Sequence, residues 1–265
     1  MKNLLHFSFS AIIAFLIFTA SVNAATYYVN ATTGSNSNSP AQARNIATPW
    51  LTVQFAIDNP AVTDGDNIVV ATGTYAGFTL TKRLNVVGAW KGSTPTVNTV
   101  FNSTVTLRAA GGSQSERMVL KNLRADVTAG DAIDIRTGYV TMENVFAKSS
   151  SVNGLRLNGD LLNDIVLESC NFDGSGIAGI FVPTFVSIDG WVMKNSTVRQ
   201  NGLWGVAAFQ RRSNPTQISN VNFSHCSFAD NNATNQQQGH TIYFEKLTNS
   251  TFGIYPSLCL LIIIG

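Results

Sequence analysis

The sequence predicts an all-β protein, a parallel β-helix solenoid in which short strands stack coil upon coil. The first observation behind this prediction is a polar side chain that recurs at one phase, at Asn122, Asn144, Ser169, Asn195, His225 and Asn249. The steps between these positions are 22, 25, 26, 30 and 24 residues. A period of about 20 to 50 residues is typical of solenoids.

The second observation is an alternation of apolar and polar residues around each recurring position. The segments are MVLKNLRA, VTMENVFA, IVLESCNF, WVMKNSTV, VNFSHCSF and EKLTNSTF. They are rich in β-branched and aromatic residues and too short for helices, so each predicts a strand. The third observation is a further alternating run in most repeats, often opened by glycine, as in LRLN after Gly154, IFV after Gly179 and VAAF after Gly205.

A β-sandwich is the main alternative fold. Its antiparallel strands would need two-residue Asn-Gly or Asp-Gly turns, and a sandwich has no reason to restore one phase in every repeat. Parallel stacking explains the constant phase, because neighbouring coils lie about 4.8 Å apart and a buried Asn amide can bond to the coils above and below. We therefore expect the recurring polar side chains to form a buried ladder.

The region before the repeats predicts a short capping helix. Thr48 followed by Pro49 is typical of a helix start, and Trp50, Val53, Ala56 and Ile57 fall close to one helical face. An amphipathic helix at this place would cover the N-terminal end of the solenoid, which would otherwise expose apolar side chains and backbone groups.

The repeat resembles that of a known family. Its pattern, Gly-apolar-x-apolar followed by apolar-x-Asn-x-x-apolar, is similar to the repeat of right-handed parallel β-helix proteins, the pectin-lyase-like group. The opening TYYVNATTGSNSNSP, and the GDNIVVATGTY that follows it, resemble the start of secreted members. The resemblance covers Thr26 to Phe252. It implies a right-handed coil, an asparagine ladder at one bend, and binding or processing of extended polysaccharides.

The two ends of the chain are expected to lie outside the solenoid domain, residues 25–253. Residues 1–24 are interpreted as a signal peptide, with Lys2 as its positive start, an apolar centre and a cut after Ala24. A retained membrane anchor is the alternative, but the apolar run is short for a bilayer span. Residues 254–265 form an apolar tail, interpreted as a truncated or frameshifted end rather than a genuine terminal strand, since solenoids need caps.

Charge and composition narrow the function classes. The formal net charge is +2 and charged residues make up 12% of the chain, with no basic stripe that would indicate nucleic acid. We expect a secreted or cell-surface monomer without a membrane span after signal cleavage. Cys170 and Cys226 each follow the recurring position and stack two coils apart, beyond the roughly 7 Å limit of a disulfide, which predicts free buried thiols.

The glycine-led runs predict a ligand-binding face. In register they turn Ile133, Leu155, Ile180, Val206 and Ile242 inward and leave other side chains outward. Exposed rings can stack on sugars, and Arg and carboxylate groups can bond hydroxyls or uronate carboxylates. The candidate binding residues are Asp134, Arg136, Arg156, Phe181, Phe209 and Tyr243. The alternative is a structural role, with an Asp134–Arg156 ion pair and the aromatic rings beneath loops.

Two functions remain open. The first is a binding protein that holds extended polysaccharide along this face. The second is a carbohydrate-active enzyme, a polysaccharide lyase or glycoside hydrolase, but the sequence contains neither the adjacent Asp-Asp pair nor the Gly-His-Gly run of polygalacturonase-like enzymes. Asp131 and Asp134 could ligate calcium, although no compact acidic loop supports it. No catalytic residue and no cofactor are therefore assigned.

Overall fold

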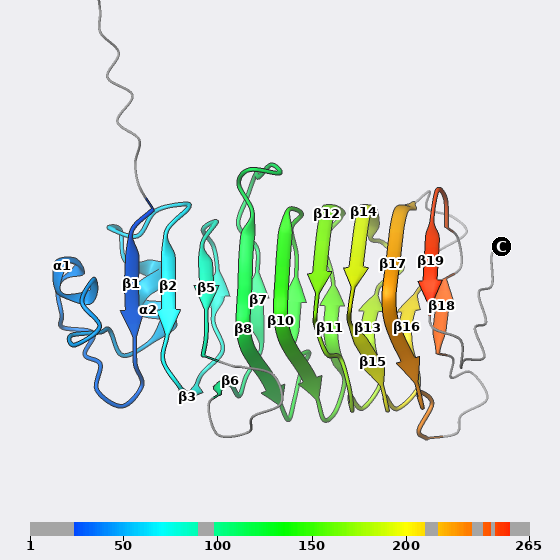
Figure 1. Ribbon diagram of the computed structural model, residues 1–265, viewed down its shortest axis with the longest axis horizontal. Helices are drawn as coiled ribbons and strands as arrows, with labels where there is room; N and C mark the ends of the chain where they lie inside the picture. Colours follow the sequence, from blue (N-terminus) through cyan, green and yellow to red (C-terminus); the bar gives the residue numbers. More distant parts are fainter. Residues whose placement is uncertain (1–23, 90–97, 210–216, 235–240, 245–246, 255–265) are drawn as a thin grey trace, which may run out of the picture.

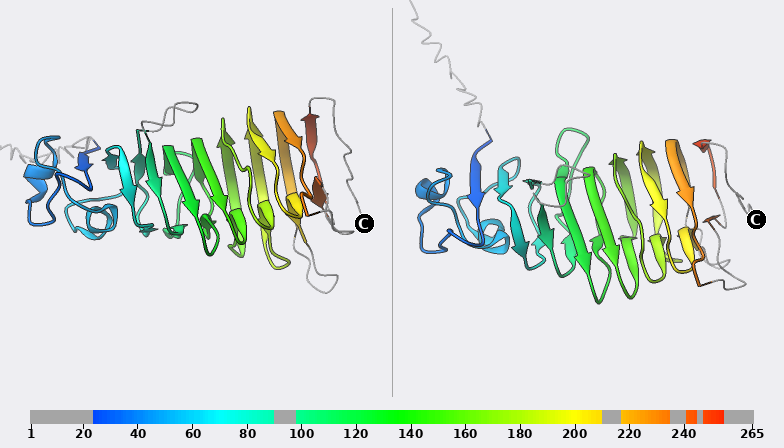
Figure 2. Two further views of the ribbon diagram at one scale, coloured as in Figure 1. Left: turned by 90° about the horizontal axis from the view of Figure 1, so that it is seen from below. Right: turned by 60° about the horizontal axis from the view of Figure 1, so that its bottom comes forward.

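The protein is a parallel β-solenoid whose coils follow one another along its long axis (Figures 1 and 2). The structure, a computed structural model, describes residues 24–89, 98–209, 217–234, 241–244 and 247–254. Every pairing between two strands of the described residues is parallel, which confirms the predicted fold and excludes the sandwich. The right-handedness of the coil stays a prediction.

Two parallel sheets form the walls of the described solenoid. The first sheet runs, in order, through β1 (Thr26–Val29), β2 (Asn67–Val70), β5 (Asn85–Val87), β8 (Met118–Val127), β10 (Val140–Ser149), β12 (Leu161–Glu168), β14 (Ser187–Lys194), β17 (Ile218–Ala229) and β15 (Thr197–Arg199), with β3 (Gly73–Tyr75), β6 (Thr99–Phe101) and β19 (Thr251–Ile254) paired beside it. The second runs through β4 (Thr79–Leu80), β7 (Val105–Leu107), β9 (Ile133–Ile135), β11 (Asn153–Leu157), β13 (Ala178–Val182), β16 (Trp204–Ala208) and β18 (Ile242–Phe244).

The recurring polar position marks a bend in the backbone. All six residues have φ between 49° and 55°, the left-handed region that Asn and His enter more readily than most residues. Asn144 Nδ2 donates to Asn122 Oδ1 at 2.9 Å. The other four recurring residues, Ser169, Asn195, His225 and Asn249, are exposed. The prediction of a buried ladder at this phase is therefore wrong, because the backbone conformation, rather than buried amide bonding, makes the position recur.

Two further bends recur with the same rhythm. Positive φ angles are found at Tyr139, Asp164, Gly190 and Asn220, and again at Gly174, Gln200 and Asp230. At the first of these sets the pairing between β12 and β14 skips one residue on each strand, so a continuous strand turns a corner without leaving its neighbour. Each repeat thus turns at left-handed corners that separate short straight segments.

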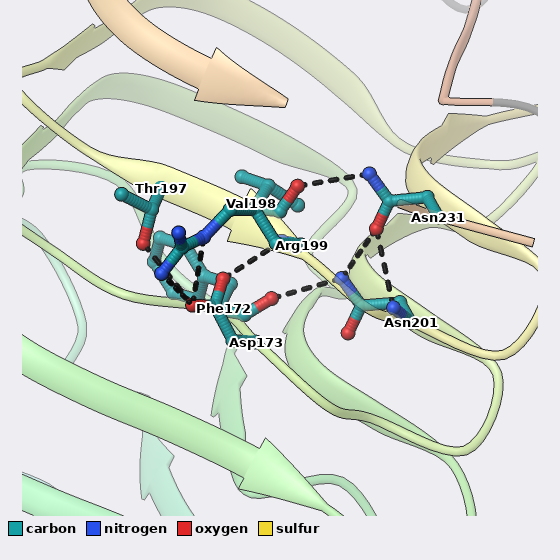
Figure 3. Close-up of polar contacts among 7 residues, drawn as sticks. All are labelled: Phe172, Asp173, Thr197, Val198, Arg199, Asn201 and Asn231. Atoms are coloured by element: carbon teal, nitrogen blue, oxygen red, sulfur yellow. Dashed lines mark hydrogen bonds and ion pairs between the residues drawn. The ribbon is translucent and has the colours of Figure 1, made fainter. Parts of the chain in front are cut away.

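A buried polar ladder does exist at a different bend, and Figure 3 shows the part of it formed by Asn201 and Asn231. Its members are the buried Ser149, Ser175 and Asn201 and the partly buried Asn231. Asn201 is 0% exposed, and its Nδ2 donates to Asn231 Oδ1 at 2.8 Å and to Phe172 O at 2.9 Å, while its Oδ1 accepts from Ser175 N at 2.8 Å. Glycine is required beside this ladder, because a Cβ on Gly179 would lie 2.7 Å from Asn201 Nδ2.

The core follows the predicted inward register. Leu155 pairs with Ile133 and Ile180, Val206 pairs with Ile180 and Ile242, and all five are fully buried. Cys170 and Cys226 are buried and free, as predicted, and the Ser196 hydroxyl between them accepts a bond from Cys170 N at 3.0 Å. Cys259 lies outside the described residues.

Two short helices, α1 (Pro40–Ala43) and α2 (Val53–Asp58), cover the N-terminal end (Figure 1). The predicted apolar face is confirmed for Val53, Ala56 and Ile57, which are buried on α2; Trp50 is buried as well but lies before the helix, in a bridge to Val29. The predicted start is wrong: α2 begins after Thr52, whose hydroxyl accepts from Phe55 N, because Trp50 is held by backbone bonds to β1. No helix among the described residues has the length and apolar character to cross a bilayer.

We predict that replacing two asparagines of one coil by glycine, one at a time, changes the free energy of unfolding by very different amounts. Asn201→Gly should lower the free energy of unfolding by about 3 kcal/mol, since buried donors and acceptors lose their partners. Asn195→Gly should change it by less than about 0.5 kcal/mol, because the side chain is exposed and its left-handed backbone suits glycine. Denaturant titrations followed by circular dichroism measure both, and equal losses would contradict the distinction.

Burial should also suppress thiol chemistry. It raises the pKa of Cys170 to about 12 and raises the pKa of Cys226 as well, so the nucleophilic thiolate is scarce at pH 8. Iodoacetamide should leave both residues unmodified in the folded protein and alkylate both in denaturant, as read by peptide mass mapping. Rapid native alkylation of Cys170 would show that the coil opens there.

Candidate functional site

The outward surface of the second sheet brings together all six residues predicted to bind a ligand. We name it the β9–β18 face: the outward side chains of β9, β11, β13, β16 and β18 and of residues up to two positions beyond their ends, from Asp131 to Tyr243. The predicted outward column is confirmed, because Arg156 pairs with Asp134 and Phe181, and Ala207 pairs with Phe181 and Tyr243. Glu245, expected in the next column, lies outside the described residues.

The half of this face over β9 and β11 is polar. Arg136 Nε and Nη2 each lie 2.7 Å from Asp134 Oδ2. Arg156 Nη1 lies 3.4 Å from Asp131 Oδ2, and Asn153 Nδ2 donates to Asp131 Oδ1 at 2.7 Å. Both arginines keep solvent access, with side chains 49% and 33% exposed. The charges of this half are therefore matched in two Arg–Asp pairs.

The predicted ion pair between Asp134 and Arg156 is not the one observed, although the two residues are cross-strand neighbours. Arg136 directly follows β9, two residues after Asp134, and its guanidinium forms the ion pair with that carboxylate. Arg156 turns instead to Asp131 at the corner before β9. Sequence register could place these groups on one surface but could not choose between two nearby carboxylates.

The half over β13, β16 and β18 is aromatic. Phe209 lies at its centre, with ring centroids 5.8 Å from Phe181, 5.5 Å from Trp204 and 5.2 Å from Tyr243. The rings enclose Ala207, which is fully buried although its side chain belongs to the outward column. Phe181, Phe209 and Tyr243 are half-buried against one another, so a continuous ring surface stays open to solvent.

Trp204 was missed by the sequence reasoning, which considered only residues after each glycine. The signal was present, because Trp204 precedes Gly205 as Asn153 precedes Gly154, and strand pairing carries this column from Asn153 through Ala178 to Trp204. At the junction of the two halves the Arg156 guanidinium carbon lies 6.0 Å from the Phe181 ring centroid. That contact makes the two halves one surface.

Three polar atoms of the polar half lack a hydrogen-bond partner among the described residues. They are Asp134 Oδ1, Asn153 Oδ1 and Arg156 Nε. A buried polar atom without a partner costs about 1–3 kcal/mol, so a water molecule or a ligand group that bonds to these atoms is stabilised here. Two acceptors and one donor are the complement of a ligand whose groups both donate and accept hydrogen bonds.

The described residues contain no group of three or more His, Cys, Asp or Glu side chains that could hold a metal ion. The fold and the face define a class of protein: a parallel β-solenoid with a mixed polar and aromatic outer surface on one sheet. No protein-family model matches the chain, and no curated protein matches it.

One similar solved structure is ORF18 of Geobacillus virus E2, with 14% sequence identity and a TM-score of 0.50. The match covers 72% of this chain and 41% of that one, so the chain spans about two fifths of the viral protein's length. At this identity the similarity supports the solenoid fold alone.

Proposed function

We propose that this protein is an exported, monomeric, pectin-lyase-like β-solenoid that binds an extended polysaccharide along the β9–β18 face. The observation that carries the proposal is the continuous surface of four aromatic rings beside two Arg–Asp pairs, contributed by successive coils. Export is supported by the N-terminal pattern of Lys2, an apolar run and Ala24.

The geometry of the solenoid suits a linear polymer. Coils in a parallel sheet repeat every 4.8 Å or so, close to the length of one sugar unit in an extended chain. A polysaccharide lying along the solenoid axis would therefore meet one set of side chains per sugar. Rings from β13, β16 and β18 would stack on sugar faces, and the polar half would bond hydroxyls.

The charges favour a ligand that is neutral over the polar half. Each arginine there is already paired with a carboxylate, so an anionic sugar would meet Asp131 and Asp134 without a free countercharge. A sugar hydroxyl can donate to Asp134 Oδ1 or Asn153 Oδ1 and accept from Arg156 Nε. Asp134 Oδ1, Asn153 Oδ1 and Arg156 Nε are buried in the free protein. The side chains of Arg136 and Arg156 are partly exposed, and they must change rotamer before a sugar hydroxyl can reach these atoms.

Loss of the central ring should abolish most binding. Phe209→Ala removes the one ring that contacts the other three and should weaken glycan binding at least about ten-fold. The readouts are retention on immobilised glucans, xylans, mannans and polyuronates, and the fluorescence of Trp204, with Trp204→Phe to assign the signal. Assays for reducing ends and unsaturated products in the same samples would reveal catalysis, which would contradict a purely binding role.

The matched control for this variant is Phe146→Ala. Phe146 also stands outward, on the first sheet, and packs against an arginine, with the Arg124 guanidinium carbon 4.2 Å from its ring centroid. It should bind glycans as the parent does. If no glycan is retained by the parent protein, or if both alanine variants lose binding equally, the β9–β18 face is not the binding surface.

A conservative change tests the polar half. Arg156→Lys keeps the positive charge and removes the unpartnered Nε–H, and should weaken neutral glycan binding about ten-fold. Arg199→Lys is the control, since Arg199 forms a comparable pair with Asp173 at 3.0 Å, outside this face; its binding should not change. Stronger binding of hexauronates than of neutral hexasaccharides would overturn the assignment of a neutral ligand.

A further inference from the structure

A buried carboxylate lies where the first strand begins. Asp66, 3% exposed, directly precedes β2. Its Oδ1 accepts from Ala25 N at 2.7 Å, and its Oδ2 accepts from Thr63 N at 2.8 Å and from the Thr63 hydroxyl at 3.3 Å. All three donors are uncharged, and the ion pairs between described residues do not include Asp66.

An ionised carboxylate removed from water is costly unless an opposite charge accompanies it. The nearby charged side chains form no ion pair with it. Lys82 Nζ donates to Asn59 O and Val62 O, at 2.8 Å each. Asp64 is acidic and accepts from Arg83 N, and the Arg83 guanidinium turns away to donate to Ala110 O and Glu116 O. The donor best placed to become charged is the nitrogen of Ala25.

That nitrogen belongs to the peptide bond at which the sequence predicts signal-peptide cleavage. Hydrolysis by a signal peptidase consumes one water: the Ala24–Ala25 C–N bond breaks, the hydroxyl joins the carbonyl carbon of Ala24, and the proton goes to the Ala25 nitrogen. At neutral pH the new carboxyl group of Ala24 releases its proton and the Ala25 amine takes one up, so the mature chain begins with an α-ammonium group on Ala25. Ala25 is also held through its carbonyl, which accepts from Asn67 N at 2.7 Å, so the new charge would remain next to Asp66.

We infer that Asp66 is a docking site for the mature N-terminus, so that cleavage after Ala24 creates an ion pair which fastens the first strand to the second. This rests on the export part of the proposed function and is independent of glycan binding. Processing would then do more than release the chain, because it would supply the countercharge that the folded carboxylate lacks and stabilise the N-terminal end of the solenoid.

The pairing has a pH signature with a definite sign. An α-amino group ordinarily titrates near pH 8 or slightly below, and a neighbouring carboxylate raises its pKa in the folded state. The added stability is therefore complete below the unfolded-state pKa and is lost as the pH rises through the folded-state pKa. The groups around it are Asp66 and the uncharged Thr63 and Asn67. Asp64, the backbone of Arg83 and the Lys82 ammonium, which donates to Val62 O next to Thr63, belong to the same turn region.

The test compares three forms of the protein: residues 25–265 with a free amino group, the same chain acetylated at Ala25, and a chain that keeps Val22-Asn23-Ala24. At pH 6 the free form should melt about 3 °C higher than the other two. The advantage should vanish at pH 10 and in Asp66→Asn. N-terminal sequencing of protein exported by a secreting host should read Ala25 first.

Equal melting temperatures at pH 6, an advantage that persists at pH 10 or in Asp66→Asn, or a different mature N-terminus would each overturn the inference. If Asp66→Asn does not fold, the acetylated form decides alone, because it keeps the N–H donor and removes only the charge. Glycan retention should be the same for all three forms at a temperature where they are folded, so failure here leaves the proposed function standing.

Discussion

The structure depends on one constraint: each coil must turn at the same corners as the coil below it. Left-handed backbone at Asn122, Asn144 and their equivalents lets a strand bend without breaking its parallel pairing. If one corner moved, every side chain of the following segment would change faces, because strand side chains alternate with a period of two. The inward columns, the buried thiols and the outward face all rest on this registration.

The buried ladder occupies one corner of the core with polar side chains in place of apolar ones. Ser149, Ser175 and Asn201 lie where backbone groups of neighbouring coils converge, and the Asn201 side chain satisfies groups of the coils on either side. Glycines in the adjacent column make room for it. Asparagine therefore has two roles at different corners of the coil. In the core its side chain forms hydrogen bonds, and on the surface its backbone adopts the left-handed conformation.

The β9–β18 face joins two kinds of surface that are usually separate. Its rings cover one another and Ala207, which leaves a firm apolar platform, while its Arg–Asp pairs hold polar atoms beside that platform. Both halves are built on strands rather than on loops, so the spacing between them is set by coil stacking. Because the backbone is fixed in this way, the protein backbone loses little conformational entropy when a ligand binds.

The sequence by itself determined the parallel coil, the inward columns and the membership of the outward face, because period and alternation are local properties that stacking preserves. The residues Ile133, Leu155, Ile180 and Val206 could be aligned without a structure. Only the tertiary structure decided which partner each side chain takes. Arg156 chooses Asp131 over Asp134, Trp204 joins the rings, and the recurring asparagines bend the chain on its surface while Asn201 lies buried. These partners depend on the distances between coils at the corners, because the alternation of a strand does not determine where a side chain points there.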